Sequence, residues 1–216
     1  MSTRILLADD HSILREGLKA LIAKSSSLAV VAEASSGVEA LRLARESKPD
    51  VVIMDVAMPE LNGIEATRQL MADLPATKVI ALSMHSDRRF VIEMLRAGAC
   101  GFVLKQGAYE ELARAVETVM SGQTYLSAGV VDVVVRDYVN KLAGTDSPAY
   151  SKLTVRERQV LQLIAEGNST KEIAKVIRVS IKTVESHKLN IREKLGIDSL
   201  AGLTKFAIRE GITTLE

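Results

Sequence analysis

The chain has 216 residues, of which 47% are hydrophobic and 25% charged, with a formal net charge of +1 and a single cysteine, Cys100. No apolar run approaches the roughly 18 residues that a membrane span needs, and residues 5–8 form too short an apolar run for a signal peptide. One cysteine excludes a disulfide framework and a cysteine-based metal site. We therefore expect a soluble cytoplasmic protein with one large domain or two small ones.

The charge is unevenly distributed along the chain. Residues 1–150 contain 16 basic and 19 acidic side chains, whereas residues 151–216 contain 12 basic and 8 acidic ones. A modestly basic C-terminal part behind an acidic one suggests a nucleic-acid partner, although ordinary scatter of surface charge explains the imbalance equally well.

Short apolar runs alternate with helically spaced segments over the first 120 residues. The expected strands are 5–8, 28–34, 51–55, 79–82 and 101–104. The expected helices are 11–24, 37–46, 64–72, 88–97 and 109–120. Five strand–helix pairs predict an α/β flavodoxin-like fold, with a five-stranded parallel sheet in the order 2-1-3-4-5 and right-handed crossovers.

Polar side chains occur where these strands end. Four apolar residues, 51–54, run directly into Asp55, which is typical of a strand buried on both faces. Equivalent positions in the other strands hold four further polar residues: Asp9, Asp10, Ser83 and Lys105. Because open α/β sheets bind ligands at the carboxyl ends of their strands, we expect the five side chains to converge.

This set of side chains suits phosphoryl transfer. Clustered carboxylates raise one another's pKa, and Mg²⁺ relieves the repulsion by binding carboxylates, waters and phosphate oxygens. Lys105 supplies a cation and Ser83 a hydrogen-bond donor for a phosphoryl group, and Asp55 would be the covalent nucleophile. Each residue alone has a simpler explanation, as a helix cap, a turn residue or a solvated lysine, but five at strand ends favour a site.

Two neighbouring residues allow more than one interpretation. His11 could be a metal ligand, but an exposed residue near a helix start is the more common situation, and we prefer it. We interpret Cys100 as a small core residue, because no histidine is obviously placed to activate it.

Residues 127–142 are rich in valine, which favours a strand. However, Val130, Val134 and Tyr138 recur at intervals of four, and Asp132 precedes Arg136 by four, as in a helix. We predict a helix here, followed by a flexible linker over the small and polar residues 143–149.

After the linker the hydrophobic period is helical throughout. Thr154 and Glu157 form an expected capping box. Helices should cover 155–166, 171–177, 181–195 and 200–210, with Asp198 capping the last one and Gly211 ending it. The second and third of these, joined by the tight turn 178–180, have the lengths of a helix-turn-helix.

The helix 181–195 has two distinct faces. Val184, Ile191 and Leu195 form a core stripe, and Leu189 stands on the opposite, polar face, where a thymine methyl group would be a suitable partner. Glu185 could accept from a cytosine amino group, and several lysines suit phosphates. The expected DNA-contacting residues are Lys182, Thr183, Glu185, Ser186, Lys188, Leu189, Asn190 and Lys194. A small helical bundle with a charged face would show the same periodicity.

Residues 1–122 resemble the receiver domain of two-component response regulators. The matching features are Asp9-Asp10, Asp55 with Met58-Pro59 and Gly63, Ser83, and Lys105. The resemblance implies that Asp9, Asp10, Asp55 and the backbone carbonyl of Ala57 bind Mg²⁺.

The same resemblance implies that Asp55 accepts phosphate from a sensor histidine kinase. Ser83 and Phe102 would be the switch pair, although simple core packing explains Phe102 equally well. Gln106 departs from the family pattern, since many receivers have a proline after the lysine, so the conformation of that loop is in doubt.

Residues 151–214 are similar to the LuxR/FixJ/NarL-type DNA-binding domain. The resemblance lies in five segments: Leu153–Val160, Glu166–Asn168, Lys171–Ala174, Thr183–His187 and Lys194–Gly196. It implies a four-helix domain that binds DNA as a dimer, with residues 200–210 contributing to dimerisation. We therefore expect a receiver in residues 1–122, a linker helix and flexible linker in 123–150, and a DNA-binding domain in 151–216.

Together these features predict a phosphorylation-dependent transcription factor that forms a homodimer on promoter half-sites. RNA polymerase is a further candidate partner. We expect no enzyme activity beyond the receiver's own phosphoryl transfer and autodephosphorylation. An alternative is a receiver that acts through protein–protein interaction, with the C-terminal part as a dimerisation module. A haloacid-dehalogenase-type phosphatase is disfavoured, because its nucleophile usually lies on the first strand with Asp-x-Asp spacing.

Overall fold

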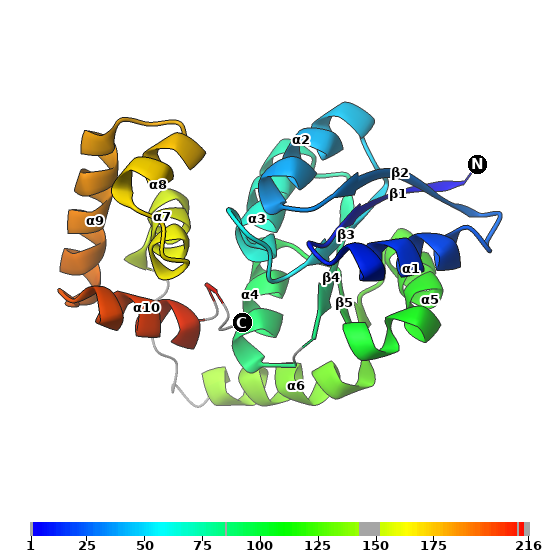
Figure 1. Cartoon of the computed structure of the whole chain (residues 1–216). Coiled ribbons are helices and arrows are strands. Elements are labelled where there is room, and N and C mark those ends of the chain that lie inside the picture. The colour runs from blue at the N-terminus through cyan, green and yellow to red at the C-terminus, as the bar shows by residue number, and fades with distance from the viewer. Residues whose placement is uncertain (1, 85, 143–151, 211, 214–216) are drawn as a thin grey trace. The chain divides into compact units, whose positions relative to one another are not determined.

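A computed structural model of the chain describes residues 2–84, 86–142, 152–210 and 212–213. The chain forms two compact units, Met1–Ala143 and Gly144–Glu216, and Figure 1 labels most of their elements. The flexible linker predicted over residues 143–149 lies outside the described residues.

The N-terminal unit is built on a parallel sheet in the order β2-β1-β3-β4-β5-β6. Its strands are β1 Thr3–Ala8, β2 Leu28–Ala34, β3 Val51–Asp55, β4 Lys78–Ser83, β5 Gly101–Leu104 and β6 Tyr125–Leu126. The predicted order of the first five strands is confirmed. The prediction of only five strands was incomplete, because a two-residue strand such as β6 is too short to show a period-two pattern.

Helices cover both faces of this sheet (Figure 1). They are α1 Ser12–Ile22, α2 Gly37–Ser47, α3 Gly63–Asp73, α4 Arg88–Ala97 and α5 Ala108–Met120. Along β3, Val52 and Met54 pack on the face covered by α2, α3 and α4, whereas Val51 and Ile53 pack on the face covered by α1 and α5. The strand is thus buried on both faces, as its continuous apolar run predicts.

The valine-rich segment forms a helix, α6 Ala128–Leu142, as predicted. Val130 is fully buried in the same core cluster as the inner side chains of α4, and Val133 and Val134 pack against this cluster. Burial of one helical face therefore outweighs the preference of valine for strands, which depends strongly on context.

The C-terminal unit consists of four helices in its described part: α7 Val155–Ala165, α8 Thr170–Val176, α9 Ile181–Leu195 and α10 Leu200–Arg209. The four-helix prediction and the Thr154–Glu157 capping box are confirmed. The cap predicted for α10 was wrong by one residue. Ser199, not Asp198, occupies the N-cap position, and its side chain accepts a hydrogen bond from the Gly202 N–H at 3.1 Å. The predicted end of α10 at Gly211 lies outside the described residues.

Within the described parts of the chain, every helix is too short or too polar to cross a lipid bilayer.

Candidate functional site

Asp55 is the last residue of β3 and is only 2% exposed. Ser83 ends the neighbouring strand β4, and Lys105 directly follows β5. Asp9 and Asp10 follow β1 on the other side of β3. The parallel sheet therefore brings the five predicted side chains to one edge, where its strands end.

Lys105 links two of the carboxylates directly. Its Nζ lies 2.7 Å from Oδ2 of Asp55 and 2.8 Å from Oδ2 of Asp9, and all three side chains are buried. The second oxygen of Asp55, Oδ1, accepts a hydrogen bond from the Ala57 N–H at 3.2 Å. Asp55 is thus held at both oxygens, one by a cation and one by the backbone.

Burial, followed by the negative charge of Asp9, raises the pKa of Asp55 to about 7, although Lys105 opposes this rise. Burial alone would lower the pKa of Lys105, but Asp55 and Asp9 outweigh it, so the pKa of Lys105 is raised. Lys105 therefore stays positively charged. The carboxylates of the cluster outnumber it, so a further cation would neutralise the remaining negative charge.

The remaining members of the cluster lie at the start of α1. The His11 N–H donates to Oδ1 of Asp9 at 2.8 Å, and His11 Nδ1 lies 2.8 Å from Oδ1 of Asp10. His11 is exposed and occupies the N-cap position of α1, in agreement with the preferred interpretation, but its ring also borders both carboxylates. Potential ligand atoms of Asp9, Asp10, His11 and Asp55 all lie within 4.8 Å of one another. This acidic pocket is typical of a Mg²⁺ site, because hard cations prefer oxygen ligands.

Gly63 allows α3 to begin directly beside Asp55. A Cβ atom at this position would lie 1.9 Å from the carbonyl oxygen of Asp55. The Gly63 N–H also donates to the carbonyl of Val56 at 2.9 Å. Any larger residue would push the helix away from the strand end that carries the carboxylate.

The two residues expected to form a switch are both buried. Ser83 lies at the end of β4, and Phe102 is fully buried in the same core cluster as Val130 of α6. Phe102 therefore contributes to core packing, and its role in a switch stays a prediction. After Lys105, residues Lys105–Gly107 form a 3₁₀ turn, η1, and all peptide bonds among the described residues are trans.

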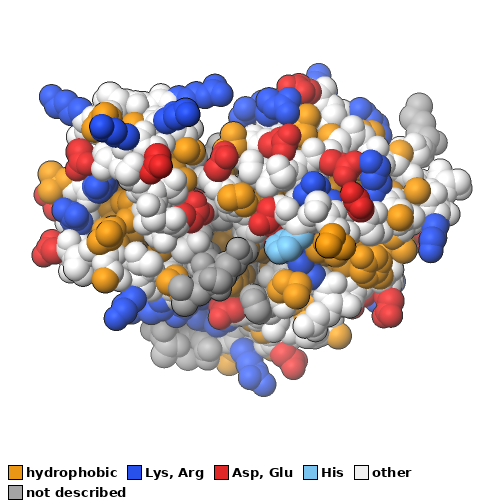
Figure 2. All heavy atoms as spheres, in the orientation of Figure 1, with side chains coloured by type: hydrophobic (Ala, Val, Ile, Leu, Met, Phe, Trp, Pro, Cys, Tyr) orange, Lys and Arg blue, Asp and Glu red, His pale blue; other side chains and the backbone are white. Residues whose placement is uncertain are grey.

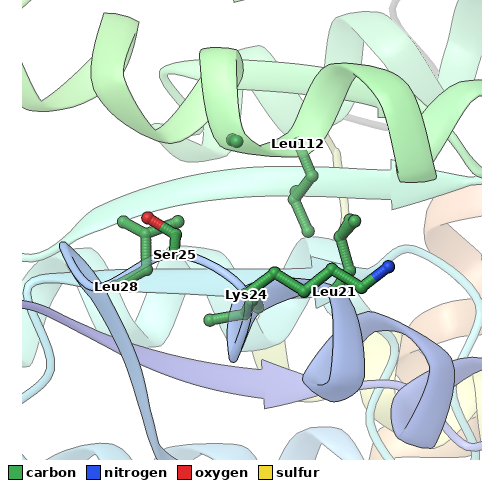
Figure 3. Close-up of a pocket in the computed structure, with 7 residues that line it drawn as sticks. Leu21, Lys24, Ser25, Leu28 and Leu112 are labelled. Atoms are coloured by element: carbon green, nitrogen blue, oxygen red, sulfur yellow. The ribbon is translucent and has the colours of Figure 1, made fainter.

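A separate pocket of about 220 Å³ lies between α1 and α5 (Figure 3). Its lining is mainly aliphatic and comes from Leu21, Ile22, Lys24, Ser25, Leu28, Leu112 and Ala113. None of these residues is a carboxylate, so the pocket is distinct from the acidic site.

In the C-terminal unit, α8 and α9 have the arrangement expected of a helix-turn-helix, with α9 capped by Ser180. A second capping box, Ser169 with Glu172, opens α8 and was missed, although its Ser-x-x-Glu pattern is visible in the sequence. Val184 and Ile191 of α9 are fully buried, as the core stripe predicts. On the opposite face, Leu189 is 56% exposed.

The expected DNA-contacting side chains of α9 differ in their surroundings. Those of Lys182, Thr183, Ser186 and Asn190 are exposed. Glu185 accepts a hydrogen bond from Thr170 of α8 at 2.9 Å, and Lys188 Nζ lies 3.1 Å from the same hydroxyl.

Lys194 lies 2.7 Å from Oε2 of Glu157, the buried acid of the α7 capping box, so its charge is already paired within the unit. Ile181, which the sequence analysis did not single out, is a further exposed apolar residue on α9. Figure 2 shows lysine and arginine side chains on this unit interspersed with hydrophobic and acidic ones.

Comparison with known proteins gives matches to two family models. Residues 5–117 match the response regulator receiver domain, and residues 151–207 match the bacterial regulatory proteins of the luxR family.

Two curated proteins are similar to the chain over nearly their whole length. Transcriptional regulatory protein MctR of Rhizobium johnstonii is 38% identical over 211 residues, which cover 98% of this chain and 95% of that protein. Oxygen regulatory protein NreC of Staphylococcus aureus is 37% identical over 211 residues, covering 96% and 97%.

Among solved structures, RcsB from Salmonella enterica serovar Typhimurium, bound to promoter rprA in the presence of the phosphomimetic BeF₃⁻, has a TM-score of 0.62 and 26% identity. The match covers 95% of this chain and 98% of that chain. Another structure holds two RcsB dimers bound to two parallel DNAs, with a TM-score of 0.60 and 26% identity over 97% and 99% of the two chains.

Proposed function

The chain belongs to the two-component response regulators with a LuxR-type DNA-binding domain, and we propose that phosphorylation of Asp55 by a sensor histidine kinase controls its dimerisation and DNA binding. As a member of this family it is a transcription factor that binds DNA through its LuxR-type domain. We assign the receiver to residues 1–122, the linker helix and flexible linker to 123–150, and the DNA-binding domain to 151–216. A cytoplasmic location fits this role.

The observation that carries the proposal is the buried contact of Lys105 with both Asp55 and Asp9. In the proposed reaction, an ionised oxygen of Asp55 attacks the phosphorus of a phosphohistidine. The new P–O bond forms as the P–N bond breaks, and the histidine leaves. In this proposal Lys105 neutralises the phosphoryl oxygens, and Ser83 donates a hydrogen bond to one of them.

Mg²⁺ is the proposed cofactor, held by the carboxylates of Asp9, Asp10 and Asp55 together with the backbone carbonyl of Ala57. Three clustered carboxylates, two of which pair with the buried Lys105, provide the excess negative charge and the hard oxygen atoms that this ion prefers. When bound, the ion neutralises charge on the transferring phosphoryl group.

Phosphate on Asp55 adds a charge of about −1.5 to −2 next to Ser83 and Lys105. We propose that Ser83 and Phe102 respond as the switch pair and that the altered receiver surface favours a homodimer. One RcsB structure holds dimers on DNA and another holds promoter DNA in the presence of a phosphomimetic, and by similarity these support a homodimer that binds DNA. RNA polymerase is a further proposed partner.

For DNA recognition we propose that α9 enters the major groove of each half-site. The exposed Leu189 would contact a thymine methyl group, and Glu185 a cytosine amino group. The remaining proposed contacts, mainly to phosphates, are Lys182, Thr183, Ser186, Lys188, Asn190 and Lys194.

Labelling with acetyl phosphate tests the phosphoacceptor directly. We expect wild type to take up one phosphoryl group per chain in the presence of Mg²⁺ and Asp55→Ala to take up none. The matched control is Asp73→Ala, which removes an exposed aspartate of α3 that pairs with Arg45 and should leave labelling unchanged. Stoichiometric labelling of Asp55→Ala would refute the assignment.

A further inference from the structure

Helix α6 has two apolar faces, and the receiver covers only one of them. The inner face packs on the core and on α4 through Val130, Val133 and Val134. The outer face presents a stripe of four large apolar side chains, which we call the α6 stripe: Val131, Val135, Tyr138 and Val139 are 42%, 55%, 64% and 56% exposed.

The spacing of the α6 stripe makes it a continuous surface. Positions 131, 135, 138 and 139 follow the i, i+4, i+7, i+8 pattern of one helical face. Single exposed apolar residues need no explanation, but a row of this kind is typical of a surface that meets a partner.

The charges beside the stripe indicate what that partner is. Asp132 and Arg136 are exposed and flank the stripe on one side, one helical turn apart. In an antiparallel helix pair related by a twofold axis, equal flanks of the two helices face each other. Asp132 then lies opposite Arg136 of a second copy, and Arg136 opposite its Asp132. A parallel pair brings different flanks together and cannot form these two contacts.

The charged and apolar patterns have neighbouring centres. The midpoint between Asp132 and Arg136 falls at Val134, and the midpoint of the stripe, which runs from Val131 to Val139, falls one residue further on, at Val135. One twofold axis can therefore align both the two ion pairs and the apolar stripe. This coincidence favours self-association over an unrelated partner.

We propose that the α6 stripe binds the α6 stripe of a second copy in an antiparallel arrangement, with the twofold axis close to Val135. The inference rests on the proposed homodimer and names the linker helix α6 as one surface through which it forms. Four side chains form a smaller contact than the roughly 800 Å² per partner of a standard interface. The α6 contact alone therefore gives only a weak dimer, which forms to a useful extent when the chain is phosphorylated or bound to DNA.

The position of α6 connects the stripe to the phosphorylation site. Arg88, in the first turn of α4 and five residues after Ser83, forms an ion pair with Asp137 on α6. At the other end of the helix, the Leu104 N–H, next to Lys105, donates to the hydroxyl of Ser127 at 3.2 Å. A rearrangement at Asp55 can therefore move α6 through contacts from two segments, the one that follows Ser83 at the end of β4 and the one that precedes Lys105 at the end of β5.

Charge reversal tests the arrangement on the full chain with beryllium fluoride and Mg²⁺, by sedimentation equilibrium. Asp132→Arg gives a chain with two arginines beside the stripe, and Arg136→Asp gives a chain with two aspartates. Each variant alone should dimerise about tenfold more weakly than wild type, because two attractive pairs become repulsive. An equimolar mixture should regain wild-type dimerisation as a heterodimer, which no effect within a single chain can produce.

Two further variants separate the outcomes. Val135→Asp should abolish the dimer, whereas Ile13→Asp, at an 85% exposed position on α1, should leave it intact. If wild type dimerises but both reversals and Val135→Asp leave the dimer unchanged, the dimer uses another surface and the inference is wrong, while the proposed function stands. If wild type itself stays monomeric with beryllium fluoride, Mg²⁺ and DNA, the proposed dimerisation fails together with the inference.

Discussion

The acidic site of the receiver and the outer face of α9 use the same kinds of side chain in opposite ways. At the acidic site, Asp9, Asp55 and Lys105 are buried and lie within 2.8 Å of a partner, so each side chain relies on the others for its contacts. On α9, most of the proposed contacts are exposed to solvent. The difference indicates that changes at the first site alter folding and chemistry together, whereas changes at the second alter binding alone.

Removing the buried cation should have the largest effect. Lys105→Met leaves Asp9 and Asp55 without their shared partner, and breaking a buried pair costs about 3 kcal/mol or more. We expect urea titration at pH 8 to show a loss of this size in the free energy of unfolding. Lys182→Met, which removes an exposed lysine on α9, should change it by less than about 0.5 kcal/mol. Equal losses in the free energy of unfolding for the two variants would show that the acidic site and the exposed face of α9 do not differ in this way.

Filling the space beside Asp55 should have the next largest effect. Gly63→Ala places a methyl group against the Asp55 carbonyl, and overpacking of this kind costs about 1–3 kcal/mol. Gly17→Ala is the matched control, because the atom nearest to its new methyl group is the hydroxyl of Tyr109, the movable end of a side chain. Thermal unfolding should show a clear loss only for Gly63→Ala, and an unaltered midpoint would argue against close packing of α3 on the strand end.

The raised pKa of Asp55 predicts a pH dependence of stability and of metal binding. The folded protein without metal keeps the Asp55 proton up to about pH 7, whereas the unfolded chain loses it near 3.8. The folded state therefore binds more protons in this window, and this group makes the free energy of unfolding fall as pH rises from about 4 to 7.

Mg²⁺ needs the ionised carboxylate, so its affinity should fall by up to about tenfold per pH unit below 7. Titration calorimetry at pH 6, 7 and 8 measures this pH dependence. The affinity of the Asp55→Asn variant should depend less on pH than that of wild type. A Mg²⁺ affinity that is independent of pH in wild type would place the ion away from Asp55.

The smallest effects are expected on α9, where each lysine acts separately. Lys188→Ala should lower the slope of log affinity against log salt by about one, because one phosphate contact is lost. Lys194→Ala should change the slope less, since its amino group is paired with Glu157. Fluorescence anisotropy over a range of salt concentrations distinguishes them, and a larger change for Lys194→Ala would show that the lysine leaves Glu157 on DNA.

The two regions also differ in how far the sequence could predict them. The convergence of Asp9, Asp55 and Lys105 follows from the order of parallel strands, which apolar runs make visible. The periodicity of α9 assigned Val184 and Leu189 to the correct faces. It could not show that Lys194 reaches back to Glu157, because periodicity defines a face and not the path of a long side chain.

The remaining misses are local. β6 has only two residues, and its pairing with β5 depends on tertiary contacts that no pattern of that length records. Asp198 and Ser199 are both good capping residues, and the choice between them rests on where α10 begins. The contact of His11 with both carboxylates depends on its rotamer at the start of α1.

We propose that the state of Asp55 controls the C-terminal unit. We would measure molecular mass and DNA binding together, with and without beryllium fluoride and Mg²⁺, on wild type and Asp55→Ala. Only wild type should gain both dimer and DNA affinity when the phosphomimetic is added. Strong DNA binding that stays the same in all four conditions would contradict it and make the C-terminal unit a constitutive DNA binder.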